Sequence, residues 1–254
     1  MKTLALDLGN STLLAGEFRG KKLVRQFRVP AAAVLSAGAF ATEVAHRISS
    51  DVSRVVLCSV VPARTERLMV HLRRTLNIEP DVLTPLADHG LQLAYRRPAE
   101  LGADRLANAL GAAKLYAGRN VIVVDCGTAT TLTLLRRDGC LLGGAIMPGL
   151  ALWADMLAQR TARLPAVELQ WPRQAVGRDT QAALRSGILH GHTGAIRELI
   201  RQCRREAFGR AAVVVLGTGG AVTHFKSQSL FTALEPGLIL HGLQAFALRT
   251  FSHA

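Results

Sequence analysis

Two apolar segments of this chain each end in an aspartate that is followed by a glycine and several hydroxyl side chains. They read LALDLGNST over residues 4–12 and VIVVDCGTATT over residues 121–131. An apolar run of this length is typical of a buried strand, and glycine lets the backbone turn so that its N–H groups approach a phosphate. Asp7 and Asp125 lie 118 residues apart in a chain of 254. The pair therefore predicts a duplicated domain with a nucleotide phosphate chain between the halves.

The pattern of expected elements repeats in the same way. Each half reads as a strand, a turn and two further strands, followed by helix, strand and helix. We expect an N-terminal half over residues 1–117 and a C-terminal half over 118–254, joined near residues 116–120. This arrangement resembles the α/β, two-domain actin-like fold, which is a duplicated ribonuclease H-like fold. Such a resemblance concerns the fold and does not decide function.

The composition is that of a globular protein, with 49% hydrophobic and 19% charged residues. No stretch approaches the roughly 20 continuous apolar residues of a membrane span, and the first residues run directly into a strand pattern rather than a signal peptide. We therefore expect a cytoplasmic protein with no membrane partner. The net charge of +13 with only 5% aromatic residues favours attraction of anionic substrates over nucleic-acid binding.

The cysteines and histidines show no metal-ligand spacing. The four cysteines are scattered without a CxxC pair, and none of the eight histidines forms a pair typical of a metal site. Free thiols are the expectation in a reducing compartment, and a zinc site is not predicted.

Both aspartate turns carry groups suited to phosphoryl transfer. The first offers the Asp7 carboxylate for magnesium-associated water, backbone amides at Gly9 and Asn10, and the hydroxyls of Ser11 and Thr12. The second offers an equivalent set, with Thr128 placed to reach a phosphate oxygen. Either turn alone is also explained by an aspartate that caps its own turn. The occurrence of two at domain-repeat distance favours nucleotide binding.

A third segment, LGADRLANA over residues 101–109, lies between the two repeats. Asp104 and Arg105 fall in the first turn of an expected helix, where aspartate is a common capping residue. The alternative makes Asp104 the base that accepts the proton of an acceptor alcohol, with Arg105 holding an anionic part of the substrate. The spacing alone leaves both open.

Taken together, the motifs resemble the type III pantothenate kinases. They match in order from residue 4 to about residue 243: DLGNST, SVVP (59–62), Y-x2-P (95–98), GADRLAN, DCGTATT, GG-x-I-x-PG (143–149), T-x2-LP (161–165), VGRDT-x5-SG-x3-G (176–191) and LGTGG. The resemblance implies transfer of the ATP γ-phosphate to the primary hydroxyl of pantothenate, the first step of coenzyme A synthesis.

The resemblance also implies a role for each matched residue. Asp104 is implied to accept the proton, and Asp125 to bind the monovalent cation, potassium or ammonium, that the family uses beside ATP and Mg²⁺. The implied ATP contacts are Asp7, Leu8, Gly9, Asn10, Ser11, Thr12, Leu13, Leu14 and Thr128. The implied pantothenate contacts are Tyr95, Gly102, Ala103, Asp104, Arg105 and Thr180. A homodimer is implied as well.

One position departs from the family pattern. Thr133 stands where many members carry an acidic or amide residue, which leaves the affinity for magnesium open. Two other functions stay as alternatives, namely a regulatory homologue that assists transcription and an actin-fold kinase of another small alcohol. Retention of Asp7, Asp104, Asp125 and Thr180 favours catalysis over a purely regulatory role.

Overall fold

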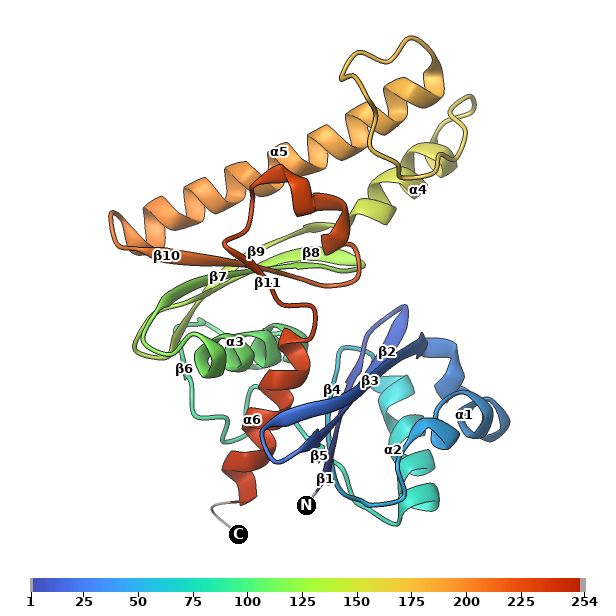
Figure 1. Cartoon of the computed structure of the whole chain (residues 1–254), viewed down its shortest axis with the longest axis vertical. Helices are drawn as coiled ribbons and strands as arrows, with labels where there is room; N and C mark the ends of the chain where they lie inside the picture. The colour runs from blue at the N-terminus through green and yellow to red at the C-terminus, as the bar shows by residue number, and fades with distance from the viewer. Residues whose placement is uncertain (1, 252–254) are drawn as a thin grey trace. The chain divides into compact units, whose positions relative to one another are not determined.

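The computed structural model describes residues 2–251 and divides into two compact units (Figure 1). The first comprises Met1–Ala117, Gly139–Leu141 and Gly237–Ala254, and the second Gly118–Asp138 and Leu142–Pro236. The last helix is thus grouped with the first unit, although it follows the second in sequence. The division into halves at 117 and 118 stays a prediction, and its ends at residues 1 and 252–254 lie outside the described residues.

The first unit is built on a five-stranded sheet in the order β3-β2-β1-β4-β5. Its strands are β1 (Lys2–Leu8), β2 (Thr12–Arg19), β3 (Lys22–Pro30), β4 (Val52–Ser59) and β5 (Asp81–Val82). The central strand β1 pairs antiparallel with β2 and parallel with β4. Successive side chains of β1 point to opposite faces, and Thr3 to Leu6 are all buried. Both faces of this sheet are therefore covered.

Helices cover the two faces. Figure 1 shows α1 (Ala37–Glu43) and α2 (Pro62–Leu76) on one side of the sheet, and their Phe40, Leu68 and Leu72 join the core with Leu4, Leu6 and Leu8. The other side holds α3 (Ala103–Leu115) and α6 (Leu238–Phe251). These two helices pack closely, since a methyl group at Gly242 would overlap the carbonyl of Ala107. Short 3-10 turns are η1 (Ala31–Val34), η2 (Ala45–Arg47) and η3 (Pro98–Glu100).

The second unit repeats this sheet topology. Its strands are β7 (Asn120–Cys126), β8 (Ala129–Leu135), β9 (Cys140–Pro148), β10 (Val213–Thr218) and β11 (Ala233–Leu234). They follow the order β11-β10-β7-β8-β9, and the short strand β6 (Gln92–Leu93) pairs with the start of β9 at Cys140 and Leu141. As in the first unit, the central strand β7 pairs antiparallel with the next strand and parallel with β10. The duplication read from the sequence thus has a counterpart in strand order.

Helices α4 (Leu150–Arg160) and α5 (Thr180–Phe208), with the 3-10 turn η4 (Val222–Gln228), complete the second unit. In Figure 1, α5 runs across its sheet, and Leu184, Ile188, Leu189 and Ile196 pack on Ile122, Val124, Leu132 and Leu134. The Asp179 side chain accepts a hydrogen bond from the Ala182 N–H and so caps α5. The predicted α/β class is confirmed. Within residues 2–251, no helix combines the length and hydropathy of a membrane span.

Candidate active site

The first aspartate turn lies at the end of β1 in the first unit. Asp7 stands opposite Cys58 in the β1–β4 register, and the Cys58 thiol donates to Asp7 Oδ1 over 3.5 Å. The Gly9 N–H donates to the carbonyl of Thr12 over 2.9 Å and closes the turn. Asn10 is exposed at the tip of this turn. The turn therefore presents polar groups to solvent above a half-buried carboxylate–thiol contact.

Three of the predicted ATP contacts have buried side chains. Leu8, Leu13 and Leu14 are at most 8% exposed. Only the backbone of these three residues is free to meet a nucleotide. The exposed residues of this predicted set are Asn10 and Ser11 in the first turn and Thr128 in the second.

An arginine that the sequence analysis missed supports the same turn. Arg64 lies in the first turn of α2, and its Nη1 donates to the carbonyl oxygen of Asn10 over 2.6 Å. The Ser59 hydroxyl donates to the carbonyl of Leu8 over 3.1 Å. Arg64 follows the SVVP motif by two residues. Since proline favours the first helical position, Pro62 signals that a helix starts just before Arg64, but no sequence pattern signals that this helix start lies at the first turn.

Asp104 occupies the first turn of α3, where Gly102 is the N-cap residue. The Arg105 N–H donates to Asp104 Oδ1 over 2.7 Å. A methyl group at Gly102 would overlap this oxygen, so the glycine leaves room for the carboxylate. Burial raises the pKa of Asp104, against the lowering effect of the Arg105 N–H and guanidinium. A carboxylate with a raised pKa is a better proton acceptor than an ordinary aspartate.

Cys58 links Asp104 to the first aspartate turn. Burial raises the pKa of the Cys58 thiol well above its usual range, and the negative charges of Asp7 and Asp104 raise it further. The charges of both carboxylates therefore act on one thiol. The first unit thus brings together the candidate nucleotide turn and the candidate base, which are about a hundred residues apart in sequence.

Arg105 and Tyr95 form a second contact in the first unit. The Arg105 side chain is only 6% exposed, and its Nη1 donates to the Tyr95 hydroxyl over 2.5 Å. Its guanidinium carbon lies 5.7 Å from the centroid of the Tyr95 ring. Ala103 beside it is buried. Five of the six predicted pantothenate contacts, all except Thr180, thus belong to one unit and cluster at the start of α3.

The second aspartate turn lies at the end of β7 in the second unit. Asp125 stands opposite Thr218 of β10, and the Gly127 N–H donates to the carbonyl of Ala129 over 3.1 Å. Gly219 follows with φ +91°, and a side chain there would overlap Asp125 Oδ1 and the backbone of Cys126. The LGTGG motif therefore lies directly against the predicted cation aspartate, a contact that the sequence analysis did not anticipate.

Thr128 is exposed at the tip of this turn. Its carbonyl accepts a hydrogen bond from the Gly149 N–H over 3.0 Å, and a side chain at Gly149 would overlap the carbonyls of Gly127 and Thr128. Gly149 is also the N-cap of α4. Thr133, the residue that departs from the family pattern, is 1% exposed in β8 opposite Val123.

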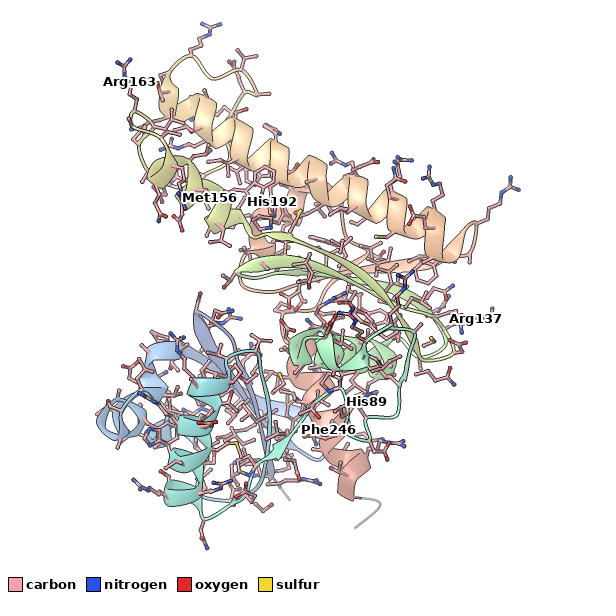
Figure 2. All side chains as sticks on the ribbon, turned by 180° about the vertical axis from the view of Figure 1, so that it is seen from behind. His89, Arg137, Met156, Arg163, His192 and Phe246 are labelled. Carbon is pink, nitrogen blue, oxygen red and sulfur yellow. The ribbon has the colours of Figure 1, made fainter. Side chains whose placement is uncertain are left out.

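Thr180 is the first residue of α5 and lines an apolar groove in the second unit. The groove has a volume of about 780 Å³, and Trp153, Met156, Leu157, Leu164 and Ile188 contribute to its walls. Met156, labelled in Figure 2, is 54% exposed. The Thr180 hydroxyl group therefore belongs to a residue that borders an exposed hydrophobic surface.

The described residues contain no group of three or more His, Cys, Asp and Glu side chains that could hold a metal ion. Tight transition-metal binding requires such a set. The candidate donors at both aspartate turns are single carboxylates with neighbouring backbone and hydroxyl oxygens. Oxygen donors of this kind suit hard cations.

Comparison with known proteins identifies the family. The model of the family described as type III pantothenate kinase matches residues 3–202. The chain belongs to the type III pantothenate kinase family. It is similar to the type III pantothenate kinase of Legionella pneumophila (strain Corby), at 37% identity over 250 residues that cover 96% of this chain and 98% of the relative. It is also similar to type III pantothenate kinase 1 of Francisella tularensis subsp. holarctica (strain OSU18), at 35% identity with 95% and 96% covered.

A structural comparison supports the fold alone. An archaeal actin homologue matches this type III pantothenate kinase family member with a TM-score of 0.56 and 12% identity, over 98% of this chain and all of the homologue. The family resemblance and the actin-like fold predicted from the sequence are therefore confirmed.

Proposed function

We propose that this chain phosphorylates pantothenate with ATP to give 4'-phosphopantothenate, the first step of coenzyme A synthesis. Membership of the type III pantothenate kinase family supports this function. The structural observation that carries it is the Asp104 carboxylate, whose pKa burial raises and which shares the neighbourhood of the Cys58 thiol with Asp7. A base beside a nucleotide turn is what phosphoryl transfer to an alcohol requires.

Asp104 is the proposed general base. It accepts the proton of the pantothenate primary hydroxyl as that oxygen attacks the γ-phosphorus of ATP, and the bond from the γ-phosphorus to the bridging oxygen breaks to release ADP. Arg105 is the proposed contact for the pantothenate carboxylate, since a guanidinium binds carboxylates with charge-assisted hydrogen bonds. Its bond to the Tyr95 hydroxyl and its burial fix its position.

The backbone of residues 7–14, the Asn10 and Ser11 side chains, and Thr128 are the proposed ATP phosphate contacts. Asp7 would hold Mg²⁺ through water, and the ion would neutralise phosphate charge when bound. Arg64 adds a positive charge beside the first turn through its bond to Asn10. The first turn is otherwise without a cationic side chain over residues 7–14.

Asp125 is the proposed ligand of a monovalent cation, potassium or ammonium. The residues present fit such an ion, because Asp125 is a single carboxylate and Gly219 brings the backbone directly against it. Neighbouring backbone carbonyls supply further oxygen ligands without added charge. A bound cation would offset negative charge in the second unit.

Two further features belong to the proposal, namely a cytoplasmic location and a homodimer. The apolar groove beside Thr180 supports the dimer, because its Met156 and Leu157 are exposed and large exposed apolar patches mark interaction sites. Size-exclusion chromatography with light scattering should give twice the 27.2 kDa of one chain. The variant Met156→Glu should shift that mass toward the monomer. A monomeric wild type would contradict the dimer but not the kinase.

The decisive experiment is a coupled assay of ADP release with ATP and pantothenate. We expect turnover that rises when potassium or ammonium replaces sodium. Asp104→Asn should lower kcat by roughly a hundredfold or more, because it removes the general base, while calorimetric ATP binding stays intact. Absence of turnover in every salt would overturn the kinase proposal, and a wild-type rate in the variant would reduce Asp104 to a helix residue without a role in proton transfer.

A further inference from the structure

The second unit buries a histidine that has no part in the proposed chemistry. His192 lies in α5 at 0% exposure, and Figure 2 labels it where this helix lies over the sheet. Its Nε2 is 3.1 Å from the Thr130 hydroxyl oxygen, a hydrogen-bond distance. Thr130 is also fully buried, in β8. The contact therefore joins α5 to the strand that follows the second aspartate turn.

Aromatic rings enclose the imidazole. The Trp153 ring meets it edge-on at 5.2 Å between centroids, and the Phe225 ring stacks on it at 5.5 Å. The preceding residue of the helix is also closely packed, since a methyl group at Gly191 would lie 3.2 Å from the Trp153 ring. Burial lowers the pKa of His192 to about 4. The imidazole is thus neutral at physiological pH, and among residues 2–251 its Nδ1 has no hydrogen-bond partner.

Trp153 is also connected to Thr128, the candidate nucleotide contact, through backbone hydrogen bonds. The backbone N–H of Trp153 donates to the carbonyl of Gly149, and the backbone N–H of Gly149 donates to the carbonyl of Thr128 over 3.0 Å. Thr128 lies two residues before Thr130. His192, Trp153, Gly149 and the 128–130 segment therefore form a closed ring of contacts, which includes one direct polar bond from α5 to β8.

We propose that His192 is a positioning residue, whose hydrogen bond to Thr130 fixes the 128–130 segment for ATP. This role rests on the proposed function. Packing alone would explain a phenylalanine or leucine at this position, whereas burying an imidazole costs desolvation, and here the imidazole has a specific hydrogen-bond partner. Thr128 directly precedes β8, two residues before Thr130, so the Thr130 contact restrains the backbone of Thr128 next to it.

The test compares two substitutions of histidine by phenylalanine on one helix. His192→Phe keeps the ring between Trp153 and Phe225 and removes the bond to Thr130. We expect KM for ATP and the dissociation constant of Mg-ADP, measured by calorimetry, to rise about five- to tenfold, the usual effect of one buried hydrogen bond. KM for pantothenate and kcat should change less than twofold. The matched control is His190→Phe, two residues away, where the histidine is exposed and packs on Trp171; it should change none of these.

A second variant keeps the test decisive if the first fails to fold. Thr130→Val removes the hydroxyl at nearly constant shape and should raise the same two constants by the same factor. In the double variant the two constants should rise no further than in either single variant, because both substitutions remove the same interaction. A lower melting temperature with unchanged nucleotide constants in both variants would overturn the inference and leave His192 a packing residue. Calorimetry with Mg-ADP needs no turnover, so a failure of the kinase proposal is seen separately.

Discussion

The two aspartate turns have the same sheet setting but different supports. Asp7 and Asp125 each end a central strand that pairs antiparallel with the next strand and parallel with a third. The facing residues in the parallel register are Cys58 for Asp7 and Thr218 for Asp125. The first turn is held by side chains, namely the Cys58 thiol and the Arg64 guanidinium. The second is held by close backbone contacts at two glycines.

This difference bears on what each turn is able to bind. Gly149 and Gly219 bring bare backbone against Thr128 and Asp125, so carbonyl oxygens and N–H groups gather at the second turn. A site of that kind suits a weakly hydrated monovalent ion. In the first unit, the negative charge of a second carboxylate, Asp104, acts on the same Cys58 thiol as Asp7 and raises its pKa. The duplicated strand order therefore carries two turns with different supports, and the proposed base Asp104 belongs to the same unit as the first turn.

The largest expected effect separates the two aspartates. Asp7→Asn should lower kcat/KM for ATP roughly a hundredfold, as expected for loss of the carboxylate that would hold Mg²⁺ at the phosphates, and should keep the acceleration by potassium. Asp125→Asn should abolish that acceleration. Steady-state assays in sodium and in potassium measure both. An equal response of the two variants to potassium would show that the turns are not specialised as we propose.

The next largest effect compares the second turn, which is supported by close backbone contacts, with the first turn, which is supported by side chains. Gly219→Ala should lower the free energy of unfolding by about 2 kcal/mol or more, because Gly219 has φ +91° and a methyl group would overlap Asp125 and Cys126. Gly9→Ala is the matched control in the first turn, where φ is not positive and the nearest atom would be the Thr12 carbonyl oxygen at 3.5 Å. Urea unfolding compares them. Similar losses would remove the distinction between the turns.

Much of this arrangement was readable from the sequence because it is local. The helix over Ala103 to Leu115 and the strands ending at Asp7 and Asp125 follow from apolar periodicity and from the glycines that end each run. Glycine is a poor helix former, yet α5 continues without a break through Gly191. The reason is tertiary, since the glycine there accommodates the Trp153 ring.

The supports of the site were not readable, because each depends on residues distant in sequence. Cys58 meets Asp7 through parallel pairing of β1 and β4, and Gly219 meets Asp125 through β7 and β10. No local sequence pattern determines the pairing register of two strands that lie far apart in the chain. The same holds for the Arg64 contact with Asn10. The strands β6 and β11, with two residues each, carry no periodic signal at all.

A third effect tests the buried imidazole of the second unit. The pKa of His192 is lowered from 6.5 to about 4 by burial, so the unfolded chain binds a proton before the folded one does. Its contribution to stability is therefore complete above pH 6.5 and is lost as the pH falls toward 4. Between pH 7 and pH 5 the loss should be about 2 kcal/mol. Urea unfolding of the wild type and of His192→Phe at both pH values isolates this loss of unfolding free energy. Equal pH dependence in the two proteins would contradict the prediction.

The smallest expected effect lies at the thiol that supports the first turn. Cys58→Ala should raise KM for ATP about fivefold, because it removes one weak donor to the Asp7 carboxylate. Cys58→Ser keeps a donor, so its KM for ATP should lie between those of the wild type and of Cys58→Ala. The matched change is Thr218→Val at the equivalent register position, where within residues 2–251 no side-chain hydrogen bond is made; it should leave KM for ATP unchanged. The raised pKa of Cys58 also predicts slow alkylation in the native protein, so iodoacetamide labelling reports whether the thiol stays buried. If the Thr218 variant affected ATP as strongly as the Cys58 variant, support by side chains would not be what distinguishes the first turn.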